Sequence, residues 1–122
     1  MRWRDPKGVI VLSVKIDTTG QVVTAYLEGD IDHHTAREMR ELIDKEIELN
    51  MPTLLVLDFS SVGFMDSSGI GLVMGRYRVL SKTGAELAVT GCSPSIYKVM
   101  KLSGIERLAK MELGGFKVDT NK

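Results

Sequence analysis

The feature that most constrains the fold of this chain is a run of four apolar residues, Leu54 to Leu57. A strand there is apolar on both faces, which is typical of a central strand covered by helices. Apolar residues at helical spacing predict one helix before it, at about 35–50, and another after it, at about 67–82. Strands that alternate with helices indicate an α/β fold with parallel pairing and right-handed crossovers.

The remaining elements complete a small mixed sheet. Residues 9–14 and 22–27 are rich in β-branched side chains and lie on either side of turn-forming residues 17–20, which predicts an N-terminal hairpin. A further strand is expected at 86–90 and a helix at about 93–102, and the tail from 109 onward has room for one edge strand. We therefore expect a single α/β domain over residues 1–122, with helices packed on the parallel strands. Its core is expected at about 8–110, with a short tail at 111–122.

Composition narrows the class of protein. A chain of 122 residues is long enough to bury one hydrophobic core. Its 16 basic and 16 acidic residues give no net charge, which argues against a nucleic-acid partner. A single cysteine, Cys92, excludes an internal disulfide and fits a reducing compartment. No signal peptide and no apolar run of membrane-spanning length is recognised, so the expected location is the cytoplasm, with no membrane partner.

The candidate site is the segment from Phe64 to Gly71, which follows the central strand and opens the second predicted helix. It places Asp66, Ser67 and Ser68 at a helix N-terminus, where the helix dipole favours negative charge. A phosphate on such a serine would be tolerated by its own domain and would change what the surface binds. The alternative is an ordinary N-cap followed by a glycine-softened helix start.

A second polar loop is expected beside the first. Asp32 follows the second strand of the hairpin, and Ser67 follows the central strand. Since functional loops of open α/β sheets gather beyond the carboxyl ends of the strands, we expect Asp32 and Ser67 in one neighbourhood. Asp32 can instead cap the helix that begins near His33, which is the competing interpretation.

Other chemistries fit the sequence less well. His33 and His34 diverge in direction and lack a third ligand, so no metal site is predicted. A hydrolase triad of Ser67, His33 and Asp32 lacks the Gly-x-Ser-x-Gly elbow. A small nucleotide-binding α/β protein remains an alternative, although Gly69-Ile70-Gly71 lies inside the helix and lacks the Walker lysine.

The second predicted helix carries unusual residues on its surface. Gly69, Gly71 and Gly75 each lower helix propensity, so they serve either close packing or the approach of a partner backbone. Arg76 is expected on a solvated helix face, where it contributes to a partner surface.

Two motifs, Gly29-Asp30-Ile31-Asp32-His33-His34-Thr35-Ala36 and Phe64-Met65-Asp66-Ser67-Ser68-Gly69-Ile70-Gly71, resemble those of the anti-sigma factor antagonists. These are bacterial single-domain proteins of the STAS fold. The resemblance runs from about 9 to 108 and is strongest to the sporulation members that act on the forespore sigma factor. The chain departs from the family at its end, because 110–122 is too short and glycine-rich for the family's last helix.

The resemblance implies partner switching and no catalysis by this chain. The unphosphorylated antagonist binds an anti-sigma factor that is also a serine kinase, and the sigma factor is released. ATP and magnesium belong to that kinase, and a serine phosphatase resets the antagonist. The acceptor carried over from the family is Ser67, and the partner-binding residues expected are Asp32, His33, Asp66, Ser68, Gly69, Gly71 and Arg76. Action in another regulatory complex, such as a stress-response assembly, is the alternative within the family.

Overall fold

The computed structural model describes residues 3–4, 10–11 and 13–113 of the chain. Its main sheet has five strands in the order β3-β4-β5-β6-β7. β3 runs antiparallel to β4, and every later neighbour is parallel. The strands are β3 (Val14–Thr19), β4 (Val22–Glu28), β5 (Leu54–Ser61), β6 (Glu86–Cys92) and β7 (Lys110–Leu113). This mixed sheet confirms the predicted α/β class.

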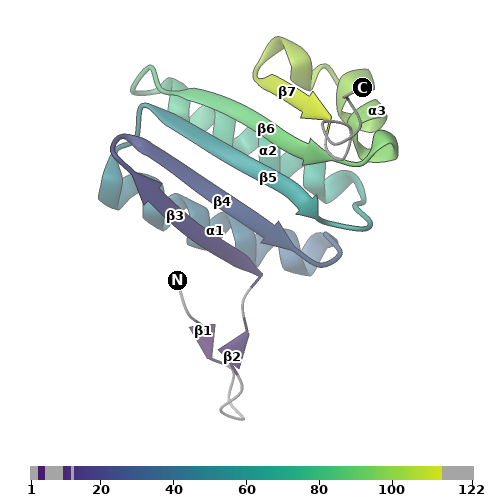
Figure 1. The fold of residues 1–122 in the computed structure, drawn as a ribbon, viewed down its shortest axis with the longest axis horizontal. Coiled ribbons are helices and arrows are strands. Elements are labelled where there is room, and N and C mark those ends of the chain that lie inside the picture. Colours follow the sequence, from purple (N-terminus) through teal and green to yellow (C-terminus); the bar gives the residue numbers. More distant parts are fainter. Residues whose placement is uncertain (1–2, 5–9, 12, 114–122) are drawn as a thin grey trace, which may run out of the picture.

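Helices connect the parallel strands. They are α1 (His33–Asn50), α2 (Ser67–Ser81), α3 (Pro94–Leu102) and the short 3-10 turn η1 (Ile105–Arg107). Each parallel strand lies next to the previous one in the chain, so right-handed crossovers that always step in the same direction leave every helix on the same face. Figure 1 shows α1 and α2 behind the sheet and its other face uncovered in the part of the chain described.

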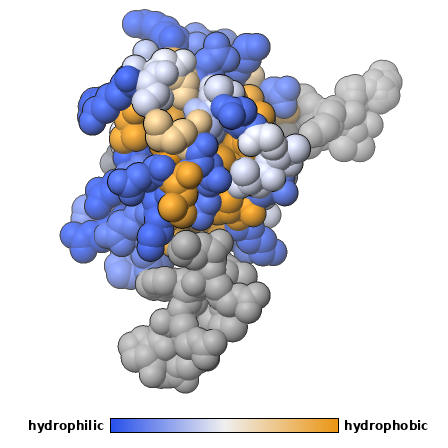
Figure 2. Space-filling view, turned by 90° about the vertical axis from the view of Figure 1, so that its left-hand side faces the viewer, coloured by the Kyte–Doolittle hydropathy of each residue, from blue (hydrophilic) through white to orange (hydrophobic). Residues whose placement is uncertain are grey.

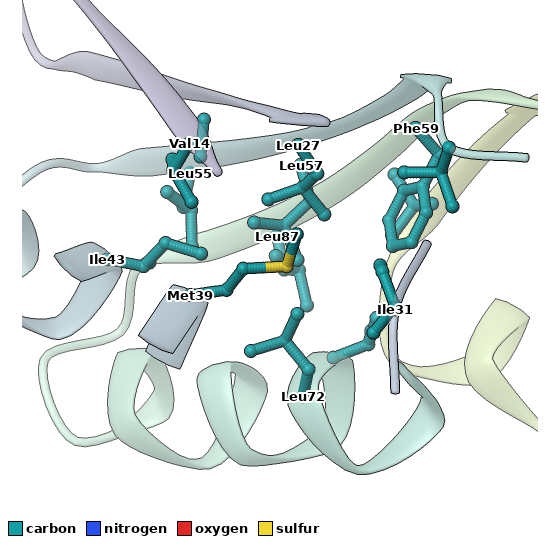
Figure 3. Packing of buried hydrophobic residues seen from close by; sticks show 14 of the residues in the cluster. Val14, Leu27, Ile31, Met39, Ile43, Leu55, Leu57, Phe59, Leu72 and Leu87 are labelled. Atoms are coloured by element: carbon teal, nitrogen blue, oxygen red, sulfur yellow. The ribbon is translucent and has the colours of Figure 1, made fainter. Parts of the chain in front are cut away.

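The core lies between the sheet and these helices. In β5, Leu55, Leu57 and Phe59 are fully buried, whereas Leu54 and Val56 are only half-buried. The position of β5 at the centre of the sheet is as predicted, but helices cover one of its faces, not both. Figure 3 shows Met39 and Ile43 of α1 and Leu72 of α2 directed toward the buried sheet residues.

The first strand was predicted in the wrong place. The hairpin strand is Val14–Thr19, and not 9–14, and it pairs with β4 as far as Thr19 and Val22. The turn is therefore formed by Gly20 and Gln21, with Gly20 at a φ of 61° that glycine adopts readily. Within 9–14, Ile10–Val11 form β2, which pairs with β1 (Trp3–Arg4), while Val9 and Leu12 lie outside the described residues.

The ends of the later elements agree with the sequence. α3 begins at Pro94, capped by the Ser93 hydroxyl, which accepts the Ile96 N–H at 3.3 Å. The edge strand expected in the tail is β7, parallel to β6. The glycines that follow it, Gly114 and Gly115, lie outside the described residues.

Gly91 marks a tight contact between β6 and β5 close to their carboxyl ends. Its φ is 75°, and a Cβ there would meet the backbone nitrogen of Ser60 at 2.8 Å. Gly84 has a similar φ of 78° with nothing within 4 Å of the same position. Both glycines therefore have a positive φ that disfavours other residues. Only at Gly91 would an added side chain also collide with a neighbouring strand.

Replacing each of these glycines by alanine separates the two constraints. Gly84→Ala should cost about 1–2 kcal/mol of unfolding free energy, the cost of a left-handed conformation for an L residue. Gly91→Ala should cost clearly more, because the Ser60 backbone must also move. Urea unfolding followed by circular dichroism measures both, and equal losses would mean that the Ser60 contact relaxes without cost.

Candidate functional site

Two loops that lie far apart in the sequence are joined by hydrogen bonds at the carboxyl ends of β4 and β5. Ile31 donates its N–H to the Phe64 carbonyl at 2.8 Å and accepts the Asp66 N–H at 3.0 Å. Ile31 and Met65 therefore form an isolated parallel bridge, and the Ile31 side chain is fully buried. This clamp brings the start of α1 and the start of α2 side by side, which confirms the neighbourhood expected for Asp32 and Ser67.

Asp32 is the N-cap of α1. Its Oδ1 accepts the Thr35 N–H at 2.8 Å and the Thr35 hydroxyl at 2.7 Å. These hydrogen bonds lower the pKa of the Asp32 carboxyl, and the one from the Thr35 backbone N–H has the largest effect. Asp32 is therefore a carboxylate at neutral pH. The capping interpretation is thus what the geometry shows, and a second role for the exposed charge remains a hypothesis.

The neighbouring histidines begin the helix. His33 is the first residue of α1 and is exposed, and His34 lies one turn before Glu38, with its Nε2 3.4 Å from Glu38 Oε2. In residues 3–4, 10–11 and 13–113, no three His, Cys, Asp or Glu side chains gather in a way that could hold a metal ion.

Asp66 caps α2 in the same manner. Its Oδ1 accepts the Ser68 N–H at 2.8 Å, and its carbonyl accepts the Gly69 N–H at 3.0 Å. Ser67 is the first residue of the helix and is exposed, whereas Ser68 is half-buried. The Ser67 hydroxyl makes no hydrogen bond to any residue that the structure describes, so it is the more accessible of the two serines.

The three glycines of α2 have different surroundings. Gly69 is buried, and a Cβ there would collide with the Met65 side chain, so Gly69 serves close packing. Gly71 and Gly75 have nothing within 4 Å of that position. Gly71 is exposed, and because it has no side chain, the backbone of α2 is accessible there, near the N-terminus of the helix.

Arg76 is not on a solvated face, contrary to the sequence prediction. It is 4% exposed and lies between α2 and α1, where its Nε is 3.1 Å from Asp44 Oδ1. The alignment is too poor for a hydrogen bond, and Nη1 is also buried without a described partner. Burial raises the pKa of Asp44 and lowers that of Arg76 despite their attraction. Helical spacing alone could not reveal this, because the residue faces a helix from another part of the chain.

Sequence analysis also missed two residues that shape the site. Ile31 and Phe64 belong to the two motifs but were assigned no role of their own, yet Ile31 forms the clamp and Phe64 is 56% exposed. A single apolar residue inside the polar stretch Gly29–His34 was the available signal for Ile31. For Phe64, apolar character alone gave no way to tell a surface position from a core one.

The opposite end of the molecule has a groove that contains none of the predicted site residues. Its volume is about 760 Å³, and residues of α1, including Leu42, Ile47 and Glu48, line it together with Val79 and Lys82. Figure 2 looks onto this end, where orange apolar surface is interrupted by blue hydrophilic residues.

None of the helices described is both long and apolar enough to cross a membrane.

Comparison with known proteins places this fold in a defined class. A family model described as "STAS domain" matches residues 13–114, which include the whole main sheet and both capped loops. An anti-sigma F factor antagonist of Paenibacillus polymyxa is 31% identical over 97 residues, covering 80% of this chain and 83% of that protein.

Solved structures of an anti-sigma factor antagonist have the same fold. The anti-sigma factor antagonist SpoIIAA in its unphosphorylated form superposes with a TM-score of 0.72 at 30% identity, covering 88% of this chain and 94% of that one. The phosphorylated form of SpoIIAA, a Bacillus cell fate determinant, gives a TM-score of 0.66 at 29% identity, covering 89% and 99%. The chain belongs to the STAS-domain anti-sigma factor antagonists, which are regulators and not enzymes.

Proposed function

We propose that this antagonist works by a partner switch in which Ser67 is the phosphate acceptor. The observation that carries the proposal is the position of Ser67, exposed at the first residue of α2 with a hydroxyl that no described residue engages. The unphosphorylated chain binds an anti-sigma factor that is also a serine kinase, and this binding frees the sigma factor. Transfer of a phosphate from the kinase's ATP to Ser67 then ends the complex.

The other parts of the cycle belong to partner proteins. The kinase supplies ATP and magnesium, and a serine phosphatase removes the phosphate, so this chain needs no cofactor of its own. The location that fits these partners is the cytoplasm, and neither a membrane nor a nucleic acid is part of the cycle.

The proposed contact surface surrounds Ser67. Asp32 and His33 approach from the start of α1, and Asp66 and Ser68 flank the acceptor. Gly71 keeps the next turn of α2 low, so that a partner backbone can approach. Two residues expected from the sequence are left out of this surface, because Gly69 lies under Met65 and Arg76 is buried against α1.

The charge of a phosphate is large enough for such a switch. Phosphorylation adds nearly two negative charges. Facing a partner carboxylate at roughly 6 Å, these charges repel it by about 1.4 kcal/mol in water and about 5.5 kcal/mol at an effective dielectric constant near 20. That energy weakens binding by roughly tenfold to ten-thousandfold. The same charge at the N-terminus of α2 is locally favourable, so the antagonist itself stays folded.

The first test is the identity of the acceptor. We expect Ser67→Ala to abolish incorporation of phosphate from the cognate kinase and ATP, because the accessible hydroxyl is removed. Ser68→Ala is the matched control and should be labelled like the parent. Intact mass with fragmentation measures both, and labelling that persists in Ser67→Ala but disappears in Ser68→Ala would refute the assignment.

The second test separates charge from unfolding. Ser67→Asp carries about half the charge of a phosphate, so it should weaken binding to the kinase by about threefold to a hundredfold through charge repulsion. Its melting temperature should stay close to that of the parent, since the helix N-terminus tolerates the charge. Gln21→Glu adds one charge in the β3–β4 turn, far from the site, and should change neither quantity. A large drop in the melting temperature of Ser67→Asp would show that the switch disrupts the fold.

The third test concerns the Asp32 charge. Asparagine caps a helix about as well as aspartate, so Asp32→Asn should keep the parent's stability at neutral pH. We expect it to bind the kinase more weakly or to accept phosphate more slowly, because it lacks the carboxylate. Asp17→Asn removes an equal charge from β3 as a control. If calorimetric affinity and phosphorylation rate both match the parent, Asp32 acts only as a cap.

A further inference from the structure

The loop that carries the proposed acceptor also displays an aromatic side chain. Phe64 is 56% exposed and is not part of the buried hydrophobic cluster. The neighbouring Met65 and Ile70, by contrast, pack against that cluster. More than half of Phe64 is therefore open to water, and the exposed part of its apolar surface gains nothing from hydrophobic burial.

The backbone beneath this side chain is held in place. The Phe64 carbonyl accepts the Ile31 N–H at 2.8 Å, and the bridge continues through Met65 to the N-cap Asp66. Ile31 is fully buried and Met65 packs against the core, so both residues of the bridge tie the loop to the core. Because its backbone is already held, Phe64 has little backbone freedom left to lose on binding, which favours a preorganised contact.

Phe64 lies close enough to Ser67 to share an interface with it. Ser67 follows Phe64 by three residues, which span at most about 10 Å of chain. A standard protein interface covers about 800 Å² on each partner, and a circle of that area has a radius of about 16 Å. An interface of this size centred on Ser67 would therefore extend as far as Phe64.

We propose that Phe64 is an apolar anchor that occupies a hydrophobic pocket of the anti-sigma factor kinase, next to the cleft that receives Ser67. This inference rests on the proposed function and adds a contact that phosphorylation does not alter. Aromatic residues are enriched at the buried centres of interfaces, which supports this assignment. Since the ring carries no charge, it contributes to binding equally in the unmodified and the phosphorylated states.

Binding of the purified kinase should be measured for four proteins: the parent, Phe64→Ala, Ser67→Asp and the double variant. Phe64→Ala should weaken the affinity by about tenfold or more, by the same factor in both Ser67 backgrounds. Its melting temperature should match that of the parent. Leu49→Ala, which truncates a side chain that is 69% exposed at the end of α1, should bind like the parent. Phe64→Gln keeps a longer side chain than alanine but removes the apolar ring, and it replaces the alanine variant if that variant does not fold.

The outcomes distinguish this inference from the proposal on which it rests. If Phe64→Ala binds like the parent while Ser67 is still phosphorylated, the anchor is refuted and the acceptor stands. If Phe64→Ala weakens binding only in the Ser67 background, the residue acts through the switch and is not an independent anchor. If the parent neither binds the kinase nor accepts phosphate at Ser67, both proposals are overturned.

Discussion

The order of the strands in the main sheet determines where the helices and loops around it lie. From β4 onward, each parallel strand joins the edge of the one before it, so each right-handed crossover places its helix on the same face. Three helix N-termini therefore gather at one end of the sheet, where the parallel strands finish (Figure 1). The topology of the sheet alone therefore determines where on the molecule a partner would be recognised.

Within that region the Ile31 clamp gives the site its rigidity. Two backbone hydrogen bonds and one buried side chain hold the starts of α1 and α2 together, and each start is closed by an aspartate cap. The caps and the clamp satisfy backbone groups that a helix otherwise leaves without partners. Ser67 is consequently an exposed group on a fixed support, and its chemistry can change while the support does not.

Sequence patterns predicted the parts of this arrangement that depend on local chemistry. The Asp66-Ser67-Ser68 helix start and the nearby Asp32 were identified because capping residues and strand ends have local signatures. Contacts between distant segments were harder to predict. The first strand was misplaced because β-branched residues at 9–14 resembled a strand more than Val14–Thr19, whose polar residues resembled a turn. Arg76 was misjudged because only the packing of α1 on α2 buries it, and Gly91 became notable only once the Ser60 backbone lay against it.

The single cysteine of the chain, Cys92, can serve as a probe of local opening of the sheet. Cys92 is fully buried at the end of β6, and burial is the main cause that raises its pKa to about 11. The thiol is thus protonated and shielded at neutral pH, and a thiol reagent can modify it only in molecules whose sheet has opened locally. The rate of modification therefore reports how often the sheet opens at the carboxyl end of β6, the end at which α2 begins, without the introduction of another cysteine.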